Sequence, residues 1–256
     1  MSQSREPVLP SGLRPPADDA EARTLLLDGE IDVEGRMLDA SNVTLVGTIR
    51  TGTLEAECVY KPVAGERPLW DFPDGTLAGR EVSAALVSEA TGWRIVPPTV
   101  LREGPFGAGM VQLWVDGDAS VDLAAFVRRD HPGLRRMAVF DAVVNNADRK
   151  GGHVLPLADG RRLGVDHGVT FHVEPKLRTV LWGWLGASLD DDERAGVARV
   201  RTDLGPDLDG DLARRLAGLL APDEVAALAR RCERLLSAAR FPHPEGDMPA
   251  VPWPLF

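Results

Sequence analysis

The stretch VVNNADRKGGHVLPLADGRRLGVDHGVTF, residues 143–171, sets short apolar runs around an Asp159-Gly160 pair. An Asp-Gly pair between two such runs is a strong signal for a β-hairpin with a two-residue turn. Counting back from that turn along both strands places His153 opposite Asp166, and directly opposed residues have Cβ atoms about 4.5–5.5 Å apart. The sequence therefore predicts an imidazole and a carboxylate side by side at the open end of a hairpin.

Asp148 and Lys150 lie just upstream of this hairpin, so a second carboxylate and an ammonium group are expected near its open end. Carboxylates gathered in this way can hold a divalent cation that is bound to substrate phosphates. One carboxylate can instead orient or deprotonate an incoming hydroxyl group. The alternative interpretation is a polar turn in which the Asn and Asp side chains only cap backbone groups.

The sequence before this stretch alternates like β-strands between Gly-bearing turns and contains one helical run. Strands are predicted over residues 24–35, 42–49, 53–62, 97–103 and 110–117, and the helix over residues 76–92. The rest of the chain is mainly helical, with helices predicted over residues 121–129, 133–146, 211–220 and 223–240 and a helix start at residues 190–193.

An antiparallel sheet followed by helices predicts an α+β fold of two lobes, joined by the loop at residues 116–118 and separated by a ligand cleft. The predicted parts are an irregular N-terminal tail, a sheet-rich N-lobe with one helix, a mainly helical C-lobe that carries the hairpin, and a Pro-rich C-terminal tail. They cover residues 1–20, 21–116, 117–240 and 241–256 in that order.

The composition limits the classes of partner. The chain has 256 residues, is 44% hydrophobic and has no apolar run long enough for a membrane helix. Its first residues lack the hydrophobic segment of a secretory signal, so we expect a cytoplasmic protein. The net charge of −10 argues against binding to nucleic acid or to an anionic membrane surface, since both require a basic face.

Two residue types are scarce enough to be informative. Cys58 and Cys232 are far apart in the sequence and suggest neither a disulfide framework nor a zinc site. The 29 basic residues include only three lysines, of which Lys61 and Lys150 lie in candidate motifs. A compact ammonium group suits contact with phosphate.

The order of these residues resembles that of protein kinases. In kinases the catalytic Asp is followed two residues later by a phosphate-contacting Lys and five residues later by a metal-binding Asn, and a hairpin then leads to a D-x-G metal ligand. Asp148, Lys150, His153 and the Asp166-His167-Gly168 run have these offsets.

The wider pattern is similar to type II phosphatidylinositol 4-kinases and to the phosphatidylinositol 3-/4-kinase-like superfamily, including a bacterial, especially actinobacterial, group whose substrate is not established. The segments that carry the resemblance span roughly residues 28–185 and are YKP, LAGREVSAALVSEATGWRIVPPT, GAGMVQLWVDG, NNADRKGG, GVDHGVTF and WGWL. The resemblance implies a two-lobed, protein-kinase-like fold with the catalytic hairpin in the C-lobe.

The resemblance also implies roles for residues outside the hairpin. Lys61, at the end of the strand CVYKP, would bind the α- and β-phosphates of ATP, and Glu81 would position it, with Glu89 on the same helix as a rival. Ser41 and Asn42 would belong to a turn that covers the phosphates. The hinge along the adenine would bind it through backbone groups and would consist of Gln112, Leu113, Trp114 and Val115.

One residue departs from the family pattern. His153 stands where kinases have an Asn, and an imidazole suits softer transition ions better than Mg²⁺, which prefers oxygen ligands. We therefore expect Asp166 to carry most of the metal binding, whereas His153 either shifts the preference towards Mn²⁺ or only forms hydrogen bonds. His167, in the position after the metal ligand, is interpreted as a packing residue.

The sequence thus predicts an ATP-dependent phosphotransferase that uses Mg²⁺ or Mn²⁺, with Asp148 and Lys150 as catalytic residues. A protein side chain or a small hydroxylated metabolite is favoured as acceptor over a lipid, because the chain has no lipidation segment and no basic amphipathic helix. Two alternatives remain open. The first is a nucleotide-binding pseudokinase that regulates a protein partner, which the His153 substitution favours, and the second is a nucleotidyl transferase on the same fold.

Overall fold

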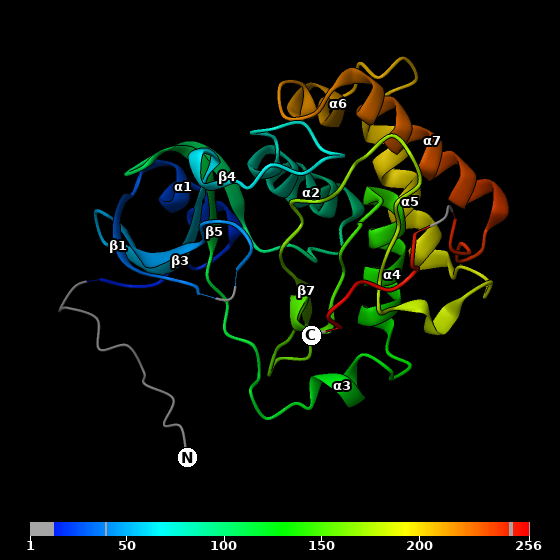
Figure 1. Cartoon of the computed structure of the whole chain (residues 1–256), viewed down its shortest axis with the longest axis horizontal. Helices are drawn as coiled ribbons and strands as arrows, with labels where there is room; N and C mark the ends of the chain where they lie inside the picture. The colour runs from blue at the N-terminus through cyan, green and yellow to red at the C-terminus, as the bar shows by residue number, and fades with distance from the viewer. Residues whose placement is uncertain (1–12, 39, 246–247, 256) are drawn as a thin grey trace. The chain divides into compact units, whose positions relative to one another are not determined.

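The computed structural model describes residues 13–38, 40–245 and 248–255. The chain forms two compact units, shown in Figure 1. Unit 1 comprises the residues up to 65 together with residues 98–114, and unit 2 comprises residues 66–97 and those from 115 onwards. The predicted N-lobe differs in that it runs without interruption from residue 21 to 116, whereas residues 66–97 belong to unit 2. The assignment of functions to the two lobes stays a prediction.

Unit 1 contains a five-stranded antiparallel sheet in the order β1-β2-β3-β5-β4. Its strands are β1 (Glu30–Arg36), β2 (Leu45–Thr51), β3 (Leu54–Pro62), β4 (Thr99–Gly104) and β5 (Gly107–Leu113). Each predicted strand is present, and the expected N-terminal antiparallel sheet is confirmed. Gly52 has a φ of 52° in the tight β2–β3 turn, a conformation that glycine adopts without a steric penalty.

The prediction was wrong for the residues before β1. Residues 19–28 form helix α1 (Asp19–Asp28), whereas residues 19 and 20 were assigned to an irregular tail and residues 24–29 to a strand. The side chain of Asp18 caps this helix by accepting hydrogen bonds from the backbone N–H groups of Ala20 and Glu21. Leu25 and Leu26 are fully buried in the hydrophobic core against the sheet. Each buried leucine contributes about 1.5–3 kcal/mol, which outweighs the strand-like local pattern.

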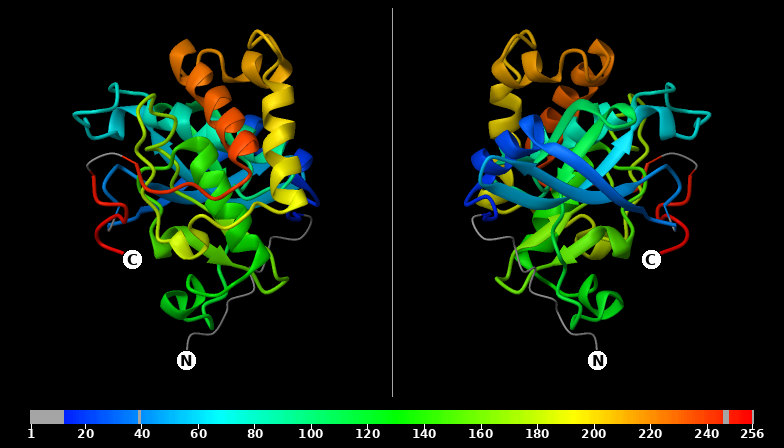
Figure 2. Two further views of the ribbon diagram at one scale, coloured as in Figure 1. Left: turned by 90° about the vertical axis from the view of Figure 1, so that its right-hand side faces the viewer. Right: turned by 90° about the vertical axis from the view of Figure 1, so that its left-hand side faces the viewer.

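Unit 2 is mainly helical, as expected for the C-terminal part of the chain. Its α-helices are α2 (Leu77–Thr91), α3 (Leu123–Phe126), α4 (Pro132–Val144), α5 (Asp191–Asp203), α6 (Asp211–Leu216) and α7 (Pro222–Ala238). Helix α4 packs against α2, α5 and α7 (Figure 2). Its side chains Leu134, Met137 and Phe140 are fully buried. The predicted helix start at residues 190–193 is confirmed, because Asp190 and Glu193 form a capping box at the start of α5.

The Pro-rich C-terminal segment contacts the body of unit 2 through backbone hydrogen bonds. The carbonyl oxygen of Ala250 accepts from the indole Nε1 of Trp182 at 2.9 Å and from the backbone N–H of Thr179 at 3.1 Å. Further along, the carbonyl oxygen of Leu255 accepts from the N–H of Gly151 at 2.7 Å. None of the helices in the described ranges is long and apolar enough to span a lipid bilayer.

Candidate functional site

The hairpin forms, but in a register one residue away from the predicted one. Strands β6 (Val154–Pro156) and β7 (Arg162–Gly164) pair so that Val154 faces Gly164. The loop between them has three residues, because Leu157 N–H donates to the carbonyl of Arg161 at 3.0 Å. Gly160 takes a left-handed φ of 89° in this loop, as is common in three-residue hairpin loops. The predicted two-residue turn is therefore wrong, and His153 lies opposite Val165 instead of Asp166.

His153 and Asp166 are nevertheless neighbours. The Nε2 atom of His153 lies 3.4 Å from the Oδ2 atom of Asp166. A one-residue slip would send Asp166 to the other face of a regular hairpin. Asp166 lies beyond the end of β7 and has a left-handed φ of 60°, so the alternation of faces does not extend to it. A backbone conformation of this kind in a residue other than glycine is uncommon and is found repeatedly at functional sites.

Asp148 and Lys150 form a partly exposed ion pair beside this hairpin. The Nζ atom of Lys150 is 3.1 Å from Oδ2 of Asp148, and the two side chains keep 21% and 29% of their surface exposed. The side chain of Asn146 links this loop to helix α4. Its oxygen accepts from the N–H of Asp148 at 2.9 Å, and its amide donates to Asp141 at 3.0 Å. Both charged groups are thus fixed in position and still accessible to a substrate.

A buried ion pair supports the loop from underneath. The guanidinium of Arg149 lies 2.9 Å from the carboxylate of Asp141, and neither side chain has any exposed surface. The same guanidinium donates to the carbonyl oxygens of Val165 at 3.0 Å and His153 at 3.3 Å. Arg149 therefore connects the last turn of α4, the loop that carries Asp148 and the residues next to the open ends of β6 and β7.

The guanidinium of Arg149 also fixes the tautomer of His167. Its Nη2 atom lies 2.6 Å from Nε2 of His167, and a guanidinium can only donate hydrogen bonds. Nε2 must therefore accept, so the ring is neutral with its proton on Nδ1. His167 is fully buried and packs edge-to-face against Phe140, with ring centroids 5.6 Å apart, in agreement with its interpretation as a packing residue.

Glu81 holds helix α2 to the segment that contains Asp166. Its side chain is 1% exposed, and Oε2 accepts from the backbone N–H of His167 at 2.8 Å. The neighbouring Arg80, also 1% exposed, donates to the carbonyl of Thr170 at 2.6 Å. Glu89, the rival candidate, instead pairs with Arg215 at 3.0 Å on a more exposed face of the helix. Of the two glutamates, Glu81 is thus the one that contacts the Asp166-His167-Gly168 run.

The donor set at the open end of the hairpin fits a divalent cation only in part. Burial lowers the pKa of the His153 imidazole, whereas the nearby carboxylate of Asp166 opposes that shift. His153 is therefore neutral near pH 7 and can act as a ligand. No group of three or more His, Cys, Asp and Glu residues in the described part of the chain is arranged to hold a metal ion. A cation bound by Asp166 and His153 would need phosphate and water oxygens as its other ligands, which is the usual situation for Mg²⁺.

With this geometry established, comparison with known proteins identifies a relative. No family model matches the chain. Protein Rv2133c of Mycobacterium tuberculosis is 48% identical to it, over 93% of this chain and 96% of the relative. The chain belongs to the Rv2133c family. That name states no activity, so membership in the family leaves the reaction open.

Among solved structures, the crystal structure of the proinflammatory kinase CtkA of Helicobacter pylori matches with a TM-score of 0.47 and 11% sequence identity. The match covers 84% of this chain and 94% of CtkA. Both measures of similarity are low.

In this member of the Rv2133c family, the candidate nucleotide-binding residues lie mostly in unit 1. Lys61 is the penultimate residue of β3, and Ser41 and Asn42 lie in the connection between β1 and β2. Unit 1 also contains Gln112, Leu113 and Trp114, and Val115 begins the second segment of unit 2. The pairing of Lys61 with Glu81 stays a prediction.

The hinge candidates differ in the backbone groups that they can offer to an adenine. The N–H of Leu113 donates to the carbonyl of Pro98 at 2.9 Å, and the N–H of Trp114 donates to that of Glu57 at 3.0 Å. Gln112 is buried, and its side-chain amide donates to Thr99 at 2.8 Å. In the described residues, the N–H of Val115 donates to no backbone carbonyl. Val115 is thus the hinge candidate best suited to donate to a ligand.

Sequence reasoning missed Asp141, Arg149 and Arg80. The chain uses Arg for nearly all of its basic residues, and most arginines look like surface residues in the sequence. In the triplet Asp148-Arg149-Lys150, nothing distinguishes the central residue as the buried one. One signal was available, because Asp141 stands in the otherwise apolar run MAVFDAVV of a predicted helix and needs a buried partner there.

Proposed function

We propose that the protein is an ATP-dependent phosphotransferase of the phosphatidylinositol 3-/4-kinase-like type, with a protein-kinase-like fold and the catalytic hairpin in its C-lobe. One observation carries this proposal. Asp148, Lys150, His153 and Asp166 have the sequence offsets of a kinase catalytic loop and D-x-G segment, and the Asp141–Arg149 pair joins the backbone around all four. A turn that only capped itself would not need a fully buried ion pair for support.

In the proposed reaction, the oxygen of an acceptor hydroxyl attacks the γ-phosphorus of ATP. The bond from that phosphorus to the bridging oxygen breaks, ADP leaves, and the hydroxyl proton passes to the carboxylate of Asp148. Lys150, which lies 3.1 Å from Asp148, neutralises charge on the transferred phosphoryl group. Asp166 and His153 would hold Mg²⁺ or Mn²⁺, which supplies positive charge against the phosphate oxygens when bound.

The nucleotide would be bound by residues that the family resemblance implies. Lys61 would contact the α- and β-phosphates with Glu81 as its positioning residue, and Ser41 and Asn42 would cover the phosphates. The adenine would lie along the hinge of Gln112, Leu113, Trp114 and Val115. Because the N–H groups of Leu113 and Trp114 already donate to carbonyls, we assign the donation to adenine to Val115.

The proposed acceptor is a protein side chain or a small hydroxylated metabolite. A net charge of −10 works against stable association with an anionic membrane, where the lipid acceptors of the resembling enzymes lie. Nucleic acid is disfavoured as a partner for the same electrostatic reason. The reaction then takes place in the cytoplasm on a diffusible acceptor.

A second candidate function is that of a pseudokinase, which binds nucleotide and regulates a protein partner. The specific observation in its favour is the neutral imidazole of His153 in place of the oxygen ligand that Mg²⁺ prefers. Nucleotidyl transfer on the same fold is the third reading, in which the α-phosphorus is attacked instead of the γ-phosphorus.

Single-turnover reactions with ATP labelled at the α- or γ-phosphate separate the three readings. Incubation of the full chain with Mg²⁺ or Mn²⁺ and a candidate acceptor mixture should transfer the γ-label and leave the α-label in ADP. Transfer of the α-label would establish nucleotidyl transfer, and binding with neither transfer would establish the pseudokinase. Asp159→Asn, at the closed end of the same hairpin, is the matched control for Asp148→Asn and should retain full activity.

A further inference from the structure

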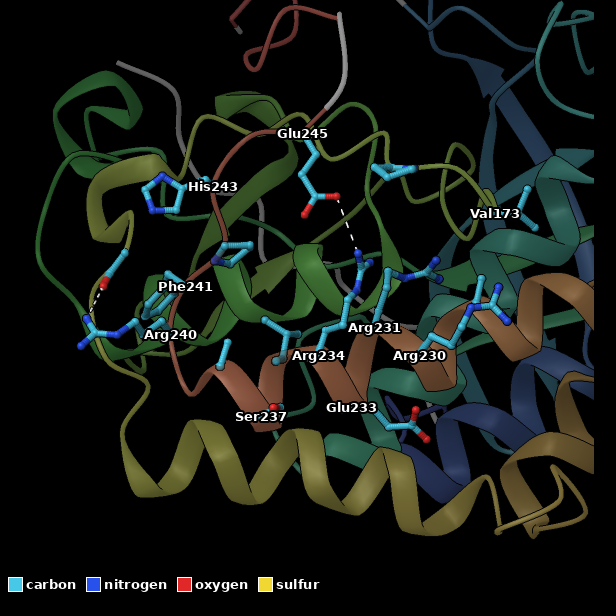
Figure 3. A pocket seen from close by; sticks show the side chains of 16 residues that line it. Val173, Arg230, Arg231, Glu233, Arg234, Ser237, Arg240, Phe241, His243 and Glu245 are labelled. Carbon is cyan, nitrogen blue, oxygen red and sulfur yellow. Dashed lines mark hydrogen bonds and ion pairs between the residues drawn. The ribbon is translucent and has the colours of Figure 1, made fainter.

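A pocket lies in unit 2, at the C-terminal part of α7 and the segment that follows it. Its volume is about 980 Å³, and it is shown from close by in Figure 3. Pockets of this size commonly hold organic ligands. None of the residues assigned above to ATP, metal or acceptor lines it. The pocket is therefore separate from the site at the hairpin.

The charges that line this pocket are mainly positive. Four arginines contribute to it, but only two glutamates. Of those two, Glu233 lies 2.7 Å from Arg201 of helix α5, so its charge is already balanced outside the pocket. Glu245 is 3.7 Å from Arg234, and both of these side chains are more than half exposed. This excess of positive charge occurs in a chain whose net charge is −10.

Arg231 is the buried member of the set. It is 7% exposed, and its guanidinium donates to the backbone carbonyls of Val143 at 2.8 Å and His172 at 3.2 Å. Its Nη2 atom has no hydrogen-bond partner in the described part of the chain, and Arg231 forms no ion pair there. Burial and the neighbouring Arg234 and Arg230 lower the pKa of Arg231 to about 10, so it remains charged near neutral pH.

A buried guanidinium without a carboxylate is costly, and an anion in the adjoining pocket would offset that cost. Arg230 and Arg234 extend from the same helix as Arg231 and line the same pocket, as Figure 3 shows. They stand one turn apart on α7, so that one anionic group can contact both. The pocket thus has two exposed cationic groups, Arg230 and Arg234, and the buried guanidinium of Arg231 beside them.

Apolar side chains form another part of the lining. It includes Val173, which is 40% exposed, Leu235, Pro242 and the buried ring of Phe241. In Figure 3, Val173 lies near the Arg230 and Arg231 end, and Phe241 lies towards the other end of the pocket. A simple inorganic anion would leave this apolar surface uncovered.

We propose that this pocket binds a small organic anion in which a carboxylate or a phosphate monoester is attached to an apolar body. The anionic group binds between Arg230 and Arg234, in front of Arg231, and the apolar body covers Val173 and Pro242, next to the buried Leu235 and Phe241. Arg231 also bonds to Val143, at the end of α4 that leads to Asp148, and to His172, beyond Asp166. The bound anion thus lies next to a side chain that joins both segments of the hairpin site.

Titration calorimetry of the full chain with phenyl phosphate tests this proposal. Saturable binding is expected, with inorganic phosphate and neutral benzyl alcohol each binding more weakly than phenyl phosphate. Benzoate distinguishes a carboxylate site from a phosphate site, because it carries the same ring with a different anion. Absence of saturable binding by both aromatic anions would overturn the proposal.

Variants locate the binding. The double variant Arg230→Gln/Arg234→Gln changes two exposed residues and should bind phenyl phosphate at least about tenfold more weakly, since two charge-assisted hydrogen bonds are lost. Arg194→Gln, an equally exposed change on α5, should bind as the wild type does. Arg231→Met is less useful alone, because it also removes two bonds to the backbone and can prevent folding.

Lys150→Gln separates this pocket from the proposed phosphate site. It should leave binding of phenyl phosphate unchanged, even if it abolishes phosphoryl transfer. If Lys150→Gln weakens binding and the double arginine variant does not, the aromatic anion occupies the hairpin site. That result would rule out anion binding in the pocket at α7. Equal weakening by Arg194→Gln would mean that only the general surface charge was measured.

Discussion

Two ion pairs of unit 2 stand next to each other in the chain and differ in exposure. Asp141 and Arg149 are fully buried, whereas Asp148 and Lys150 keep 29% and 21% of their side-chain surface. The guanidinium of the buried pair bonds to backbone carbonyls of the hairpin segment. In the described part of the chain, the two side chains of the exposed pair bond to each other. One pair holds the structure, and the other remains available to a substrate.

This difference in exposure predicts different effects of substitution in the two pairs. A buried ion pair costs desolvation and is retained where its geometry and extra hydrogen bonds repay that cost. A partly exposed pair contributes little to stability, about 0–1 kcal/mol. Substitution of Asp148 or Lys150, the exposed pair, should therefore change the reaction rate and leave folding intact. Substitution of Asp141 or Arg149, the buried pair, should mainly lower the stability of the fold.

The largest effect is expected for the exposed pair and concerns the rate of phosphoryl transfer. Asp148→Asn should slow phosphoryl transfer by about 10²–10⁴-fold, because it removes the proposed acceptor of the hydroxyl proton. Its melting temperature should stay close to that of the wild type. The measurement is the single-turnover rate with γ-labelled ATP, with Asp159→Asn, in the neighbouring hairpin loop, as the control for loss of a carboxylate.

Substitution in the buried pair, Asp141 and Arg149, should have the largest effect on stability. Arg149→Met should lower the free energy of unfolding by about 3–5 kcal/mol, because it leaves the carboxylate of Asp141 buried without its partner. Urea denaturation followed by circular dichroism measures this change. The double variant Asp141→Leu/Arg149→Met should be more stable than Arg149→Met alone, and failure to recover any stability would show that the pair does not act as a unit.

The attachment of α2 is expected to have an intermediate effect. Glu81→Ala removes a charged acceptor of the His167 N–H and should cost about 1.5–3 kcal/mol of stability. Glu89→Ala is the matched control on the same helix and should cost about 0–1 kcal/mol, since its ion pair with Arg215 is partly exposed. Equal costs for the two variants would contradict the assignment of Glu81 as the residue that fixes the helix.

Local patterns predicted the strands of the sheet and the hairpin, because alternation and turn residues act over a few positions. The predicted hairpin register was wrong by one residue. An Asp-Gly pair is compatible with both two-residue and three-residue loops, and the conformation of the whole turn decides between them. Helix α1 was missed because TLLLD reads as a strand until the cap at Asp18 and the burial of Leu25 and Leu26 are known. The role of Arg149 needed three dimensions, since its partners are backbone carbonyls that carry no sequence signal.

The smallest effect concerns the choice of metal. Its measurement tests whether His153 is a metal ligand, as proposed. His153→Asn replaces a neutral imidazole beside Asp166 with an amide oxygen, which Mg²⁺ prefers. The ratio of transfer rates with Mg²⁺ and Mn²⁺ should shift towards Mg²⁺, by about tenfold or less, a factor that corresponds to about 1.4 kcal/mol. Stability should change little, because the ring makes no buried ion pair. An unchanged metal ratio would mean that His153 only forms hydrogen bonds and that Asp166 alone binds the cation.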